Sequence, residues 1–86
     1  MDIEVSEKAE SDLDSMDPNL RKIFLKHMEK IKEMPPRRHM RFGLPFFVED
    51  VSRQSRLIYF IKDQTIFILR CFQSHKEYER WYLSFK

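Results

Sequence analysis

The sequence contains little glycine and cysteine, and it lacks a long apolar run. Its one glycine, Gly43, excludes the glycine-rich loops that cradle nucleotide phosphates. Its one cysteine, Cys71, excludes an internal disulfide, and its apolar neighbours predict a buried thiol. No segment approaches the roughly 20 apolar residues that span a bilayer, and the first ten residues are acidic, unlike a signal peptide. The sequence therefore predicts a cytoplasmic protein without a membrane segment.

The length and the charge distribution narrow the possible functions. The 86 residues suit one domain, which we expect over residues 1–86. Residues 1–34 hold six Lys/Arg and nine Asp/Glu, a balance of −3, whereas residues 35–86 hold ten and five, a balance of +5. A cationic half in a protein of net charge +2 predicts a localised site for a polyanion. No cysteine or histidine spacing is typical of zinc, so we expect neither a metal nor a cofactor.

The first third of the chain predicts a strand and two helices. Alternating polar and apolar residues predict a short strand over Asp2–Val5. Ser6 is a typical N-cap for a helix that runs toward Met16. Asp17-Pro18 is typical of the start of a second helix, whose apolar residues recur at helical spacing until Pro35-Pro36 end it.

The rest of the chain predicts strands and a final helix. Residues 40–51 are expected to be extended, with a kink at the glycine and proline. Two runs rich in β-branched and aromatic residues, 56–61 and 65–72, predict strands joined by a tight turn at 62–64. Residues 75–85 suit a helix. The predicted fold is α+β, with a small antiparallel sheet, two N-terminal helices packed on one face and a short C-terminal helix.

Acids, bases and cations gather in the second half of the chain. Metal-free RNA cleavage needs a base for the ribose 2′-OH, cations for the phosphate and an acid for the departing 5′-oxygen. A carboxylate or histidine suits the first role, arginine or lysine the second, and histidine, lysine or tyrosine the third. The same residue types also suit an ordinary charged surface. The candidates are Glu49, Asp50, Arg53, Arg56, Arg70, His75, Lys76, Tyr78 and Tyr82.

The order of these residues resembles a known family. The segments 47–59, 62–63, 66–72 and 75–82 are similar to the C-terminal half of RelE-like toxins. In that family an R-L-V-Y strand is followed by a turn, an apolar strand and a basic or histidine motif that leads to tyrosines. The first strand and residues 6–13 are also similar to the family's start. The resemblance implies an antiparallel sheet with two N-terminal helices, and endoribonuclease activity on messenger RNA.

The resemblance also implies roles for single residues. Arg56 matches the family's strand arginine, which stabilises the phosphate, and Lys76 matches a second cation. Tyr82 matches a C-terminal tyrosine that stacks on or orients RNA. Glu49 as base and His75 as acid resemble the YoeB-type branch, whereas RelE itself has a lysine at the position of Glu49. We expect further RNA contacts from Arg37, Arg38, Arg41, Arg53, Arg70 and Tyr78.

The sequence therefore predicts the toxin of a type II toxin–antitoxin system that cleaves messenger RNA without a metal, on or off the ribosome. Its expected partners are a cognate antitoxin protein and RNA. Two alternatives stay open. ParE-like relatives share the fold and act on DNA gyrase, and a degenerate family member would only bind its antitoxin. The base also stays open between Glu49 and Asp50.

Overall fold

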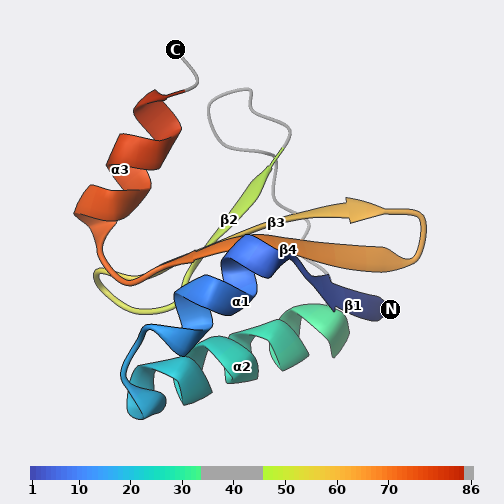
Figure 1. Cartoon of the computed structure of the whole chain (residues 1–86). Helices are drawn as coiled ribbons and strands as arrows, with labels where there is room; N and C mark the ends of the chain where they lie inside the picture. The colour runs from blue at the N-terminus through green and yellow to red at the C-terminus, as the bar shows by residue number, and fades with distance from the viewer. Residues whose placement is uncertain (34–45, 85–86) are drawn as a thin grey trace.

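The computed structural model describes residues 1–33 and 46–84, which form four strands and three helices. Along the chain these elements are β1 (Asp2–Val5), α1 (Glu7–Asp14), α2 (Pro18–Glu33), β2 (Phe47–Asp50), β3 (Arg56–Lys62), β4 (Thr65–Phe72) and α3 (His75–Leu83), as Figure 1 shows. None of the helices in this described part has the length and apolar character needed to cross a bilayer.

The four strands form one mixed sheet in the order β1-β4-β3-β2. Strands β2, β3 and β4 are antiparallel neighbours, as predicted, but β1 pairs in parallel with β4. The expectation of a wholly antiparallel sheet therefore needs correction. Parallel strands require a crossover connection. The connection from β1 to β4 contains the helices α1 and α2 and the antiparallel strands β2 and β3, and the pairings make β2 run in the same direction as β1.

Both predicted helix starts are confirmed. Ser6 Oγ accepts a hydrogen bond from the Ala9 amide at 3.0 Å, so Ser6 caps α1. Asp17 Oδ2 accepts from the Asn19 amide at 2.9 Å just before Pro18. The predicted end of the second helix and the first part of the extended segment fall on residues 34–45, which lie outside the described residues.

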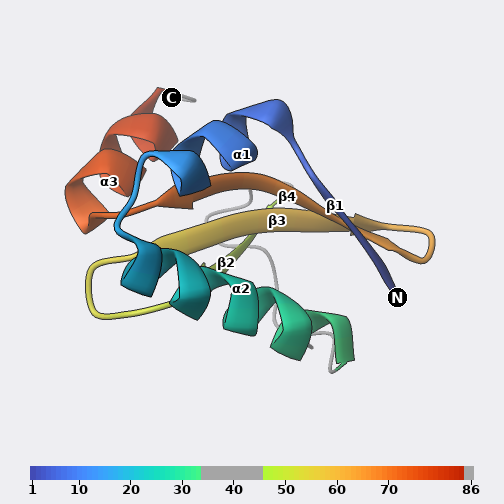
Figure 2. The same ribbon diagram turned by 60° about the horizontal axis from the view of Figure 1, so that its bottom comes forward.

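The sheet has a hydrophobic core on each face. One core joins α1 and α2 to the sheet, and its buried members are Ala9, Leu13, Met16, Phe24, Met28, Ile31, Val51, Leu57, Tyr59, Ile66, Ile68 and Cys71. The other joins α3 to the sheet through Ile58, Phe72 and Tyr78, with Phe46, Val48, Leu69, Trp81 and Tyr82 packed around them. Helices α2 and α3 accordingly lie on opposite sides of the sheet, which Figure 2 shows from a second angle. Packing of the two N-terminal helices on one face is confirmed.

An irregularity in β4 decides which residues face α3. Tyr59 pairs with Ile68 and Ile58 pairs with Arg70, so Leu69 is an extra residue that forms a β-bulge. Without the bulge, residues 68 and 71 would point to opposite faces. With it, Ile68 and Cys71 both face α1 and α2. The bulge also brings Leu69 and Phe72, three positions apart, to the core that α3 covers.

Candidate active site

Arg56 holds the loop between β2 and β3 together. Its side chain is only 12% exposed. Its Nη1 donates to the carbonyl oxygens of Ser52, Arg53 and Ser55 at 3.1, 3.3 and 2.9 Å, and its Nε lies 3.1 Å from Asp50 Oδ1. A guanidinium fixed at so many points is preorganised to receive one more acceptor, such as a phosphate oxygen.

The Asp50–Arg56 pair lies on the face of the sheet that α3 covers. Asp50 pairs with Arg56 across β2 and β3, and Arg56 pairs with Phe72 at the end of β4. Side chains two positions apart in a strand point to the same face, so Arg56 faces the same way as Ile58, which packs in the α3 core. The Asp50 side chain is 52% exposed.

The start of α3 carries His75 next to the end of β4. Ser74 caps this helix, because its Oγ accepts from the Glu77 amide at 3.2 Å. His75 Nε2 lies 2.7 Å from Glu79 Oε1 one turn later, which orients the ring. Its Nδ1 is shielded from solvent and has no hydrogen-bond partner among the described residues. The His75 side chain as a whole is 43% exposed.

The two tyrosines of α3 occupy different positions. Tyr78 is only 4% exposed and packs on Phe72, with ring centroids 6.4 Å apart. We expected Tyr78 to contact RNA, but the structure places its ring in the core. The spacing of His75, Tyr78 and Tyr82 explains this, because it forms the apolar stripe by which α3 meets the sheet. Tyr82 lies at the margin of that core, 6.2 Å from the Tyr78 ring, and is half-buried.

Glu49 points to the other face of the sheet. Its Oε2 lies 3.0 Å from His27 Nδ1 and 3.6 Å from Lys30 Nζ, both on α2. The side chains of Glu49 and His27 are 19% and 23% exposed. Successive residues of a strand face opposite ways, so the structure does not bring Glu49 to Arg56. The carboxylate beside Arg56 belongs to Asp50.

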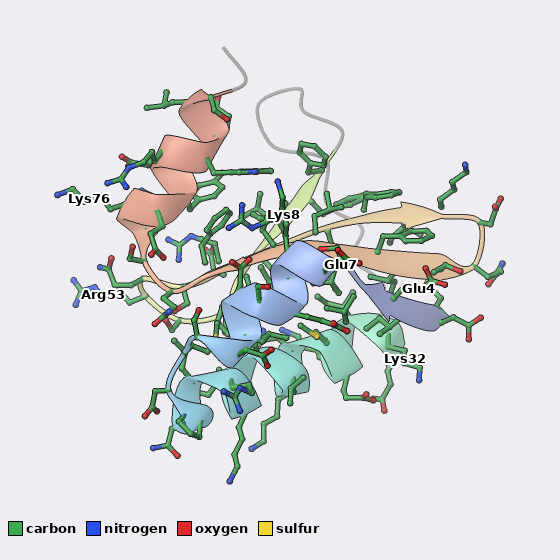
Figure 3. All side chains as sticks on the ribbon, in the orientation of Figure 1. Glu4, Glu7, Lys8, Lys32, Arg53 and Lys76 are labelled. Carbon is green, nitrogen blue, oxygen red and sulfur yellow. The ribbon has the colours of Figure 1, made fainter. Side chains whose placement is uncertain are left out.

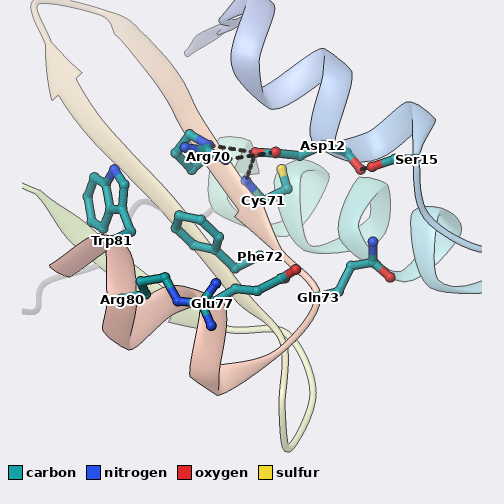
Figure 4. A pocket seen from close by; sticks show the side chains of 9 residues that line it. All are labelled: Asp12, Ser15, Arg70, Cys71, Phe72, Gln73, Glu77, Arg80 and Trp81. Atoms are coloured by element: carbon teal, nitrogen blue, oxygen red, sulfur yellow. Dashed lines mark hydrogen bonds and ion pairs between the residues drawn. The ribbon is translucent and has the colours of Figure 1, made fainter. Parts of the chain in front are cut away.

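Arg70 is engaged by α1, as Figure 4 shows. Its Nε and Nη2 donate to Asp12 Oδ2 and Oδ1 at 2.8 and 3.0 Å, and its guanidinium lies 4.7 Å from the centre of the Phe72 ring. The Cys71 amide also donates to Asp12 Oδ2, at 2.9 Å. Hydrogen bonding to Asp12 raises the pKa of Arg70, and burial raises the pKa of the Cys71 thiol to about 12. We expected Arg70 to contact RNA, and the structure instead shows it joining α1 to β4.

A cavity of about 280 Å³ adjoins this ion pair between α1, β4 and α3. Arg70 and Phe72 contribute one side of it, and Arg80 and Trp81 of α3 contribute another (Figure 4). The Asp50–Arg56 pair lies beyond β4, on the strands β2 and β3. Neither Asp50 nor Arg56 lines this cavity, although Arg56 pairs across the sheet with Phe72, which does.

The remaining predicted RNA contacts divide into two groups. Arg53, in the β2–β3 loop, and Lys76, in the first turn of α3, are exposed, and Figure 3 shows both side chains extending into solvent. Arg37, Arg38 and Arg41 fall outside the described residues. Arg53 and Lys76 are thus the exposed cations that lie close in sequence to Arg56 and His75.

Sequence reasoning missed three structural partners. Asp12 directly precedes the buried residue Leu13 in α1. This position could have indicated that its carboxylate points toward the sheet. His27 borders the apolar stripe of α2, a position from which it meets Glu49. No local signal marks Ser55, which is 2% exposed, because its partner lies on another strand end.

Comparisons with known proteins give matches in structure only. No protein-family model matches the chain, and no curated protein matches it in sequence. A chain of the intact E. coli RelBE toxin–antitoxin complex superposes with a TM-score of 0.73 at 17% identity, covering 85% of this chain and 95% of that one. The YoeB dimer from Staphylococcus aureus gives 0.69 at 18% identity, with 84% and 94% covered.

A third similar structure is the metal-bound toxin from Helicobacter pylori, with a TM-score of 0.69 at 26% identity. The match covers 90% of this chain and 97% of that toxin. Within residues 1–33 and 46–84 of the present chain, no three His, Cys, Asp or Glu side chains gather as metal ligands. The similarity to these structures establishes the fold.

Proposed function

We propose that this chain, which has the fold of the RelE/ParE superfamily of toxins, is the toxin of a type II toxin–antitoxin pair and cuts messenger RNA. One observation carries the proposal. The Arg56 guanidinium is held by three loop carbonyls and by Asp50 on the face of the sheet where α3 begins with His75. A fixed cation, a carboxylate and an imidazole are the groups that this chemistry needs.

In the proposed reaction the ribose 2′-oxygen forms a bond to the adjacent phosphorus and the bond from phosphorus to the 5′-oxygen breaks. Asp50 accepts the proton of the 2′-OH, taking the role that the resemblance implied for Glu49. Arg56 stabilises the charge that builds on the non-bridging oxygens, and His75 protonates the 5′-oxygen. The products are a 2′,3′-cyclic phosphate and a free 5′-hydroxyl. Because Arg56 supplies the positive charge at the phosphate, cleavage is expected to persist in EDTA.

The other site residues have supporting roles in this proposal. Lys76 and Arg53 are exposed cations that hold flanking phosphates. Tyr82, at the margin of the α3 core, orients the RNA strand. The toxin would act in the cytoplasm on free or ribosome-bound messenger RNA. An antitoxin would cover it when growth requires RNA to stay intact, as the similarity to a chain of the RelBE complex supports.

The same contacts of Arg56 are also compatible with a second function. The bonds of Arg56 to Ser52, Arg53 and Ser55 would serve a purely structural loop equally well. In that case the chain would act by binding a protein, either a target such as gyrase or the antitoxin alone. Ribonuclease activity that depends on Asp50 separates the two functions.

Two neighbouring carboxylates provide the test. Purified wild-type protein, Asp50→Asn and Glu49→Gln are incubated in EDTA with free RNA and with programmed ribosomes. We expect product ends with cyclic phosphate, a loss of about 10²–10⁴ in rate for Asp50→Asn and a rate near wild type for Glu49→Gln. Both changes replace one carboxylate by an amide in β2, on opposite faces, so each controls for the other. Products with a 3′-hydroxyl, or wild-type protein that cuts neither substrate, would contradict the proposal.

A further inference from the structure

Ser55, the residue directly before β3, takes part in several hydrogen bonds through its side chain and its backbone. It is the one polar residue that is buried in the described part of the chain, with 2% exposed. Its Oγ donates to the Gln73 carbonyl oxygen at 2.9 Å and its amide donates to Ser52 Oγ at 3.1 Å. Its own carbonyl oxygen accepts from the Val51 amide at 3.0 Å and from Arg56 Nη1 at 2.9 Å.

One of these bonds joins the two segments that contain Arg56 and His75. Ser55 lies at the end of the β2–β3 loop that Arg56 closes. Gln73 lies in the turn between β4 and α3, directly before the cap Ser74 and the first helical residue, His75. Within residues 1–33 and 46–84, the bond from Ser55 Oγ to Gln73 is the only hydrogen bond that links residues 51–55 to residues 73–74.

We propose that Ser55 is a positioning residue, which sets the distance between Arg56 and His75. This inference rests on the proposed function. Attack on phosphorus needs the phosphate-holding cation and the proton donor on one phosphate at the same moment. A misplacement of about 1 Å costs on the order of 10²-fold in rate. The Ser55 hydroxyl is buried, so water cannot readily replace its bond to Gln73.

The matched pair Ser55→Thr and Ser55→Val tests this role. Threonine and valine have the same shape, so both add the same bulk at a buried position, and only threonine keeps the hydroxyl. Thermal melts establish that each variant is folded. Cleavage is measured under single-turnover conditions, and affinity is measured with an RNA that carries 2′-deoxyribose at the cleaved position.

Amide hydrogen exchange gives a readout that does not depend on cleavage. The Glu77 amide at the start of α3 reports whether the helix start is held, because Ser74 caps it. The Ala9 amide, capped by Ser6 in α1, is an equivalent amide far from Ser55 in the chain and serves as the control.

We expect the Glu77 amide to exchange about ten times faster in Ser55→Val than in Ser55→Thr, which corresponds to a tenfold change in the opening equilibrium. The Ala9 amide should exchange equally in both. The cleavage rate should fall on the order of 100-fold in the valine variant, with the affinity for the 2′-deoxy RNA within about threefold.

Equal exchange of the Glu77 amide in the two variants would overturn the inference. So would a difference in exchange without a difference in cleavage rate, because the bond would then be structural only. Wild-type protein that cuts no RNA would overturn the proposed function, and the positioning role with it. In that case the exchange rates would still show whether Ser55 holds the start of α3.

Discussion

The ion pair between Asp12 and Arg70 provides a quantitative prediction. Asp12 is 16% exposed and Arg70 is 27% exposed, and the carboxylate accepts three hydrogen bonds at 2.8, 2.9 and 3.0 Å. Asp12→Ala leaves the guanidinium and the Cys71 amide without this acceptor. Hydrogen bonds to charged groups contribute about 1.5–3 kcal/mol, and the two that Arg70 donates are not independent. We therefore expect the free energy of unfolding to fall by about 2–3 kcal/mol.

Thermal and urea unfolding measure this effect. For a domain of this size 1 kcal/mol corresponds to about 4–8 °C, so the Tm of Asp12→Ala should fall by about 10–20 °C. Asp12→Asn keeps one acceptor oxygen and should lose less. Asp14→Ala, an exposed aspartate of the same helix, is the matched control and should change stability by less than about 0.5 kcal/mol. Equal effects of Asp12→Ala and Asp14→Ala would refute a structural role of the pair.

Three further predictions concern single side chains. Cys71 should resist alkylation at pH 8 while the protein is folded, because a pKa raised from 9.0 to about 12 lowers the thiolate fraction about 10³-fold; rapid labelling without unfolding would contradict its burial. Lys76→Met should weaken RNA binding and reduce the slope of log affinity against log salt by about 1; an unchanged slope would show that Lys76 contacts no phosphate. Glu49→Gln should lower the urea midpoint, since it weakens the bond from β2 to His27 of α2, and a midpoint equal to wild type would contradict a structural role for Glu49.

The elements could be predicted from the sequence because their signals are local. The Ser6 and Asp17 caps, the Pro18 start and the two β-branched runs each depend on residues within a few positions. The parallel pairing of β1 with β4 could not be predicted in this way. It joins two strands that are separated in the sequence by two helices and two other strands, so no short segment of sequence contains the signal for it.

The site could be predicted only in part, for the same reason. The sequence indicated Arg56 and His75, and the structure places both at one end of the α3 face. It could not assign Glu49 and Asp50 to their faces, because a shift of one residue in register exchanges the two. It also could not separate Arg70 from the other cations, since its partner Asp12 lies 58 positions away.

The most direct test of the account is single-turnover RNA cleavage by Arg56→Lys, with thermal melts to verify that it is folded. Lysine keeps the charge but cannot bind the three loop carbonyls, Asp50 and a phosphate together. Loss of one preorganised donor typically costs about 10²–10³ in rate, so we expect at least a 100-fold fall with the same product ends. A folded Arg56→Lys that cuts RNA within a few-fold of the wild-type rate would contradict the account.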